Sequence, residues 1–332
     1  MVSRRLVFPA RPLALLASGV LALAVSAAPA AAQTDSYPNK PITLVVAYPA
    51  GGSTDLTGRT LGNELSKKLG VTVIIENIGG AGGAIGAQKV ANAAPDGYTL
   101  MVGASNEIAI TGLVSSAVKY GLKDFTPIGL VASQPMVLVA SQKSGVKTVE
   151  QFMGQVRQSP GKYSYGSSGV GTALHLAGEM VKDQGGLFMT HIPYRGVAPL
   201  ANDLLGNNID FGMFVLSSGL PHIRSGKVVA LGTTEAKRAA QTPDIPALAE
   251  TPRLKGIDIN IWFALVGPAR LPEPVVAKLK KALNESLQSP ELRKKLEDSG
   301  STVSALNTDM PKFLTQETAK YTRIVQFAKI KE

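Results

Sequence analysis

The chain has 332 residues, 45% of them hydrophobic, with no cysteine and a formal net charge of +10. The lack of cysteine excludes disulfides and any metal or redox site built on thiolates. Lys and Arg are mixed with Glu in helix-like stretches, and no basic run carries interleaved aromatic residues, so nucleic acid is not expected as a partner.

The first 32 residues have the three-part pattern of a secretory signal peptide. Arg4 and Arg5 give a basic start, an apolar run covers 13–27, and small residues at 30–32 precede Gln33. The apolar run is shorter than the roughly 20 residues that span a bilayer. We therefore expect cleavage after residue 32 and export to the periplasm of a Gram-negative cell. The sequence leaves open whether the Sec or the twin-arginine route is used.

Strand-like and helix-like segments alternate at the start of the mature chain. Expected strands at 42–46, 71–75 and 98–102 alternate with expected helices over 56–69 and 84–93. This β-α-β-α-β order predicts a parallel sheet with helices on both faces.

A second α/β series begins after an expected strand at 136–140. Its expected helices are 148–158, 172–182, 199–205 and 220–225, and its expected strands are 163–165, 191–193, 210–213 and 228–232. A further strand at 261–266 is followed by helices that start near Pro272, Pro290 and Pro311.

These two series predict two α/β lobes joined by two crossover strands, with a ligand cleft between them. Lobe 1 is expected to contain 38–139 plus 262–330, and lobe 2 the residues 140–261. A double crossing makes a hinge, which proteins of this layout use to close around a ligand. We expect the mature protein to be a monomer.

The loop after the first strand is the first candidate binding element. Paired glycines let the backbone approach a ligand, and the N–H groups and dipole at a helix start attract an anion. An ordinary capped turn is the alternative. The candidate residues in this loop are Tyr48, Ala50, Gly51, Gly52, Ser53, Thr54 and Asp55.

Two later strand-to-helix junctions carry further candidates. Ser167, Ser168 and Thr172 offer hydroxyl and N–H groups to a carboxylate. Arg195 has the geometry to pair with a carboxylate through two hydrogen bonds, and a structural salt bridge to Asp210 is the alternative.

Enzyme and cofactor motifs are incomplete. The Gly-rich segment 77–86 does not match the dinucleotide fingerprint, and 166–172 fails the nucleophile-elbow pattern at Val170. His175, His191 and His222 lack metal-ligand spacing, so neither a metal nor a cofactor is expected. A serine hydrolase that pairs Ser167 or Ser168 with His175 remains as an alternative.

Several loops together resemble the Bug family, the TctC-like extracytoplasmic solute receptors of tripartite tricarboxylate transporters. The matching segments are 48–55, 80–83, 95–100, 165–172 with His175, 193–196, and Trp262 with 267–268. The resemblance implies a type II periplasmic binding fold that closes on a carboxylated small molecule. Carried onto this chain, the implied ligand residues are the candidates above together with Ser105, Asn106, Tyr194 and Asp210.

The resemblance implies a receptor without enzymatic activity that delivers a small organic carboxylate to membrane permease subunits. A ligand sensor for a membrane histidine kinase is the alternative. The chain departs from the family at Ile78, Gly79 and Ala84, and the segment 213–215 is apolar where the family often has a polar residue. One end of the site is therefore expected to be apolar, and the identity of the carboxylate stays open.

Overall fold

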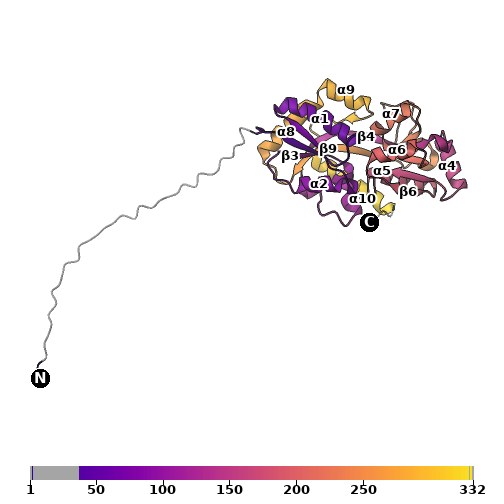
Figure 1. The fold of residues 1–332 in the computed structure, drawn as a ribbon, viewed down its shortest axis with the longest axis horizontal. Coiled ribbons are helices and arrows are strands. Elements are labelled where there is room, and N and C mark those ends of the chain that lie inside the picture. Colours follow the sequence, from indigo (N-terminus) through magenta and orange to yellow (C-terminus); the bar gives the residue numbers. More distant parts are fainter. Residues whose placement is uncertain (1, 3–36, 329, 331–332) are drawn as a thin grey trace. The chain divides into compact units, whose positions relative to one another are not determined.

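The early strands and the helices near the C-terminus build one half of the body, and the middle of the chain builds the other (Figure 1). The computed structural model describes Val2, residues 37–328 and Ile330. The expected signal peptide at 1–32 thus falls, apart from Val2, outside the described residues. Among the residues that are described, no helix combines the length and apolar character needed to cross a membrane.

The sheet of the first half is centred on β1 (Ile42–Val46). β2 (Val73–Asn77) and β3 (Thr99–Ala104) lie parallel to β1 on its two sides, as the alternation of strands and helices predicts. β9 (Asn260–Pro268) pairs antiparallel with β3, so the whole sheet is mixed. Leu44 and Val45 of β1 are both fully buried, which is typical of a strand covered on both faces.

One long strand, β4 (Phe125–Ser141), runs through both halves. Its first part pairs antiparallel with β9, and its last part pairs with β7 (Phe211–Val215) and β8 (Val228–Thr233). β5 (Ser164–Ser167) lies parallel to β7 and to β6 (Thr190–Pro193). The strand order is β2-β1-β3-β9-β4-β7-β5-β6, and β8 and β10 (Thr302–Val303) pair with β4 beside this path.

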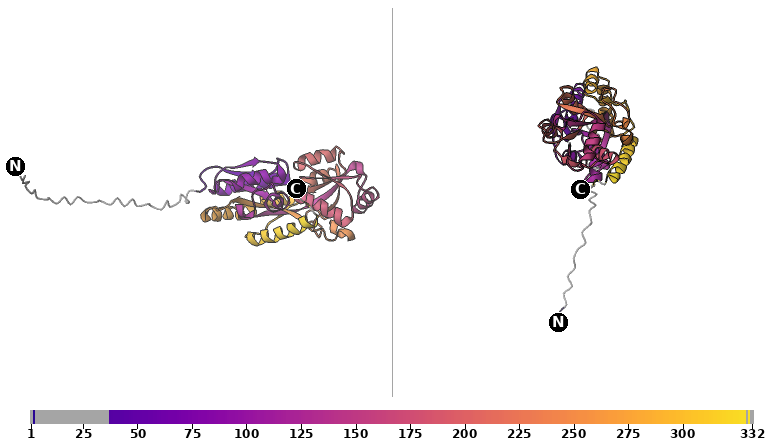
Figure 2. Two further views of the ribbon diagram at one scale, coloured as in Figure 1. Left: turned by 90° about the horizontal axis from the view of Figure 1, so that it is seen from below. Right: turned by 90° about the vertical axis from the view of Figure 1, so that its right-hand side faces the viewer.

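Helices pack on these strands in both halves (Figure 2). Those of the first half are α1 (Ser53–Leu69), α2 (Ala84–Ala91), α3 (Thr111–Val114), α8 (Glu273–Leu287) and α9 (Pro290–Asp298). Those of the second half are α4 (Val149–Gln158), α5 (Ala173–Gly185), α6 (Val197–Leu205) and α7 (Leu216–Arg224). The last helix, α10 (Met310–Phe327), contacts β4 and α5 and so touches the region where the halves join.

This architecture confirms two α/β lobes joined by crossover strands. The strand expected at 136–140 proves to be the end of the much longer β4, because the stretch before it pairs with β9. The lobe boundaries at 139/140 and 261/262 stay a prediction, since β4 continues without a break from one half into the other.

Residues 106–114 were not expected to be helical, and the structure corrects this. Asn106–Ile110 form a π-helical turn that continues into α3, and all five residues of the turn are buried. π-helical turns are rare and often lie at functional sites. This turn places polar side chains directly after β3.

Candidate functional site

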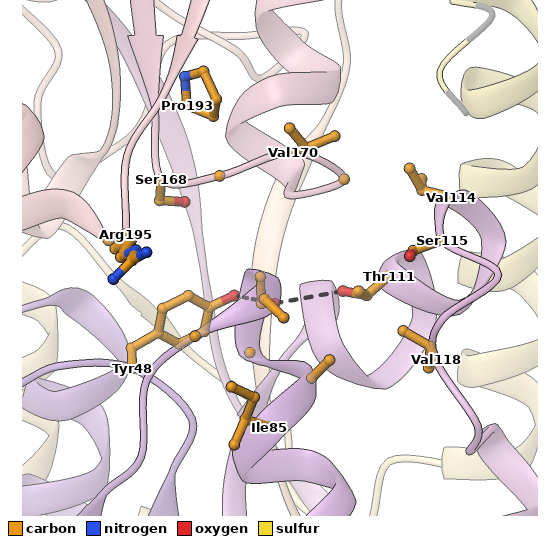
Figure 3. A pocket seen from close by; sticks show the side chains of 18 of the residues that line it. Tyr48, Ile85, Thr111, Val114, Ser115, Val118, Ser168, Val170, Pro193 and Arg195 are labelled. Carbon is orange, nitrogen blue, oxygen red and sulfur yellow. Dashed lines mark hydrogen bonds between the residues drawn. The ribbon is translucent and has the colours of Figure 1, made fainter. Parts of the chain in front are cut away.

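Loops from both halves line one cavity of about 510 Å³ (Figure 3). The first half contributes Tyr48, the segment 80–85 and parts of 111–120. The second half contributes 168–171 and 193–196. Because the loops follow β1, β5 and β6, the cavity lies at strand ends, where open α/β sheets bind their ligands.

Two helices begin at this site without a side-chain cap. Gly52 precedes α1 and Gly196 precedes α6, and neither offers a side-chain acceptor to the first-turn amides. Both first turns border a smaller cavity of about 20 Å³ that shares Tyr48, Ser168 and Gly196 with the large one. Uncapped amides and the positive end of the helix dipole favour an anion at this position.

Asn106 connects the two halves. Its Nδ2 donates a hydrogen bond to the Tyr48 hydroxyl at 2.8 Å, and its Oδ1 accepts one from the Ala173 amide at 2.7 Å. The Tyr48 hydroxyl in turn donates to the Gly82 carbonyl at 2.7 Å. The start of α5 is thus tied to a loop of the first half, and Tyr48 is held in one position in the cavity wall.

Glu107 is a buried carboxyl group behind this wall, and its side chain makes no ion pair among the described residues. Its Oε1 accepts a hydrogen bond from the Ala104 amide at 2.6 Å, and its Oε2 accepts no hydrogen bond from the described part of the chain. A Cβ atom added to Gly83, which lines the cavity, would lie 2.9 Å from this Oε2. Burial raises the pKa of Glu107 to about 8, so the group carries a proton at neutral pH.

The loop between β5 and α5 is shaped by its own hydroxyl groups. Ser167 is fully buried, and its Oγ donates to the Gly169 carbonyl at 3.1 Å. Thr172 caps α5 by accepting from the His175 amide and donates to the same carbonyl at 2.8 Å. Ser168 differs, because it lines the cavity and its hydroxyl has no hydrogen-bond partner within the described part of the chain.

Neither Ser167 nor Ser168 makes the hydrogen bond to His175 that the hydrolase alternative requires. The Oγ of Ser167 lies 2.7 Å from Nε2 of His191, whose ring stacks on that of His175 at 3.9 Å between centroids. The Nδ1 of His175 instead accepts from the Gly171 amide at 3.2 Å. Burial lowers the pKa of His175 to about 4 and that of His191 to about 3, so both rings are neutral at pH 7.

Arg195 is the only charged side chain among the described residues that line the large cavity. It is exposed, and it makes no hydrogen bond or ion pair with any described residue. The alternative of a salt bridge to Asp210 is wrong, because Asp210 accepts from the Ser164 amide at 3.0 Å instead. The neighbouring Tyr194 also lines the cavity and donates to Asp203 at 2.7 Å.

Most of the predicted ligand residues meet at these two cavities. The cavity-lining members of that set are Tyr48, Ala50, Gly52, Ser53, Thr54, Asn106, Ser168, Tyr194 and Arg195. Their role in binding stays a prediction.

The other predicted residues do not line either cavity. Gly51 and Asp55 border a separate hollow, where the Asp55 carboxylate accepts from the Gly51 amide and from Arg59. The members of the set that serve the packing of the loops or strands are Ser105, Ser167, Thr172 and Asp210.

Sequence reasoning missed part of the wall. Ile85, Thr111, Val114 and Val118 line the cavity, and three of them are apolar. Ile85 lies in α2, and the other three follow the π-helical turn in a segment where the sequence predicts neither helix nor strand. The Gly-rich run before Ile85 was the one available signal.

A family model described as tripartite tricarboxylate transporter family receptor matches residues 57–330. The chain belongs to this family, TctC. Protein BugT of Bordetella pertussis is a curated relative, 31% identical over 309 residues that cover 92% of this chain and 94% of that protein. TctC proteins are solute-binding receptors, which agrees with the expected resemblance to the Bug family.

Solved structures of related receptors share the fold. The periplasmic binding protein BugD is 33% identical and superposes with a TM-score of 0.84, covering 89% of this chain and 99% of BugD. The R. palustris protein Rpa4515, solved with adipate, is 30% identical with a TM-score of 0.85, covering 89% and 99%. These structures confirm the periplasmic-binding-protein architecture of this TctC chain.

Proposed function

We propose that this protein captures a small organic carboxylate in the cavity between its halves and delivers it to the permease subunits of a tripartite tricarboxylate-type transporter. One observation carries the proposal. Arg195, which has no described partner, lines the large cavity, and the uncapped starts of α1 and α6 border the small cavity that adjoins it. A carboxylate satisfies both kinds of donor through charge-assisted hydrogen bonds.

The residues of the site come from both halves of the body, which supports capture of the ligand by closure of the two halves. Arg195 and Ser168 come from the second half of the body, whereas Tyr48 and the start of α1 come from the first. A ligand that contacts both halves favours the closed arrangement by its differential affinity for that state. The permease subunits would then recognise the closed form of the receptor.

The family match supports a function in transport rather than in sensing, because the matching model describes a transporter receptor. We further propose that the protein works as a monomer in the periplasm after removal of residues 1–32. The receptor family and the three-part pattern of the leader support this location.

Arg195→Gln tests the function. Loss of a charge-assisted hydrogen bond of about 1.5–3 kcal/mol is expected to weaken carboxylate binding about 10- to 100-fold. The melting temperature without ligand should not change, because the Arg195 side chain has no described partner. Binding is measured by isothermal titration calorimetry against a panel of mono- and dicarboxylates, with the matching neutral amides as ligand controls.

Arg253→Gln is the matched control, because Arg253 is also exposed but does not line the cavity. It should bind like the wild type. Equal affinity in both variants would contradict the role of Arg195. Binding of neutral amides as tightly as acids would contradict a carboxylate receptor altogether.

A further inference from the structure

We propose that the cavity selects an amphipathic monocarboxylate, with one charged end and an apolar body, over dicarboxylates of the same length. This inference rests on the proposed function, since it names the ligand class of the same site. It follows from the uneven distribution of charge, hydrogen-bond donors and apolar surface around the cavity wall.

The charged end lies at Arg195. Figure 3 places Arg195 and Tyr48 at one end of the cavity and Val114 and Val118 at the opposite end. The small cavity with the first turns of α1 and α6 adjoins the Arg195 end, because it shares Tyr48 and Gly196 with the large one. A ligand carboxylate is therefore expected at that end.

The rest of the described wall holds no second charged side chain, and most of its polar side chains already hydrogen-bond to the protein. The Thr111 hydroxyl donates to the Asn106 carbonyl at 2.9 Å, and the Gln88 amide donates to Asn92 at 3.2 Å. The Tyr120 hydroxyl donates to the Glu107 carbonyl at 2.9 Å. Of the hydroxyl groups in the described wall, only those of Ser115 and Ser168 make no hydrogen bond.

The lysines on these elements lie outside the cavity wall. Lys119 donates to the Ser116 carbonyl at 2.9 Å, and Lys89 pairs with Glu76 at 2.7 Å. A second carboxylate at this end would lose water without gaining a counter-charge from the residues that line the cavity, which is unfavourable.

The same end offers apolar surface to a ligand. Val114 and Val118 line it, and Val170 and Ile85, which is 54% exposed, line the wall between the two ends. Each ligand methylene buried against such surface contributes about 0.8 kcal/mol, which is about fourfold in affinity. A volume of about 510 Å³ holds a body well beyond the carboxylate itself.

Matched acids of equal length test the selection on the full mature chain. Hexanoate is compared with adipate, and octanoate with suberate, by isothermal titration calorimetry. Each monoacid is expected to bind at least about tenfold more tightly than its diacid, and octanoate should bind more tightly than hexanoate. Tighter binding of adipate than of hexanoate would overturn the inference. Failure of all four acids to bind would instead count against the proposed function.

A charge placed at the apolar end provides the converse test. Val118→Lys supplies the missing cation, so adipate should gain affinity and hexanoate should lose it. Ala117→Lys is a second variant at an exposed lining position, and it guards against a folding defect in the first. Ser116→Lys is the control, because Ser116 is exposed and outside the cavity wall. If the ratio of adipate affinity to hexanoate affinity stays unchanged in both Val118→Lys and Ala117→Lys, this end of the cavity does not contact the far end of the ligand, and the inference is contradicted.

Discussion

At the scale of single residues, Glu107 is a buried acid near the cavity whose pKa departs strongly from its solution value. It is 1% exposed, and the titratable groups beside it in the described chain are the hydroxyls of Tyr48 and of Tyr120, the latter donating to the main-chain carbonyl of Glu107. Burial raises its pKa from 4.5 to about 8. The folded chain therefore keeps a proton that the unfolded chain releases.

This difference predicts how stability depends on pH. Between pH 4.5 and about 8 the folded state binds more protons at Glu107 than the unfolded state does, so its contribution to stability falls as pH rises. The limiting slope for one group is about 1.4 kcal/mol per pH unit. Glu107→Gln keeps the shape of the side chain but cannot ionise. The free energy of unfolding of this variant should therefore fall less steeply as the pH rises.

Urea unfolding of wild type and variant at pH 6 and pH 9 measures this effect. The variant should lose less stability than the wild type between the two values. Glu273→Gln, at an exposed position, serves as the control and should decline like the wild type. If Glu107→Gln loses as much stability as the wild type between pH 6 and pH 9, Glu107 is ionised in the folded protein at both pH values.

At the scale of elements, α5 depends on Thr172 for its start. From the sequence, Thr172→Ala is predicted to weaken binding while leaving the fold intact. The structure predicts that Thr172→Ala also lowers the free energy of unfolding, because Thr172 caps α5 and is fully buried outside the cavity wall. Loss of such a cap costs about 0.5–2 kcal/mol.

Thermal unfolding of Thr172→Ala and Thr172→Ser separates the two effects. The serine variant keeps the capping hydroxyl, so it should retain most of the stability that the alanine variant loses. Carboxylate affinity should follow the same order, because the cap positions the loop that carries Ser168. Full stability of the alanine variant would mean that the hydroxyl does not hold the start of α5.

At the scale of the whole molecule, the Asn106 side chain links the halves through its bonds to Tyr48 and Ala173. Asn106→Ala removes both bonds and should shift the free protein toward more open arrangements. Small-angle X-ray scattering should then record a larger radius of gyration without ligand. A saturating carboxylate should restore the wild-type value.

Asn284→Ala is the control for this variant. It removes the two hydrogen bonds of the Asn284 side chain with Asn307, which are exposed and lie outside the cavity wall. Its radius of gyration should equal that of the wild type. An unchanged radius in Asn106→Ala as well would show that other contacts hold the halves together.

The sequence by itself determined the alternation of elements and the fold class. The expected strand at 42–46 matches β1, and Thr148 and Asp309 cap α4 and α10 as the local signals indicate. Periodicity and capping act over a few residues, so they can be read from the sequence. The family resemblance added the loops that carry the site, and the family match confirms that resemblance.

Only the tertiary structure decided how those loops are used. It placed Ser168 in the wall and its neighbour Ser167 behind it against His191, a distinction that no sequence spacing contains. It also brought Val114 and Val118, on the segment that follows the π-helical turn, opposite Arg195. The physical reason is that charge pairing and burial depend on contacts between segments far apart in the chain, which local patterns do not record.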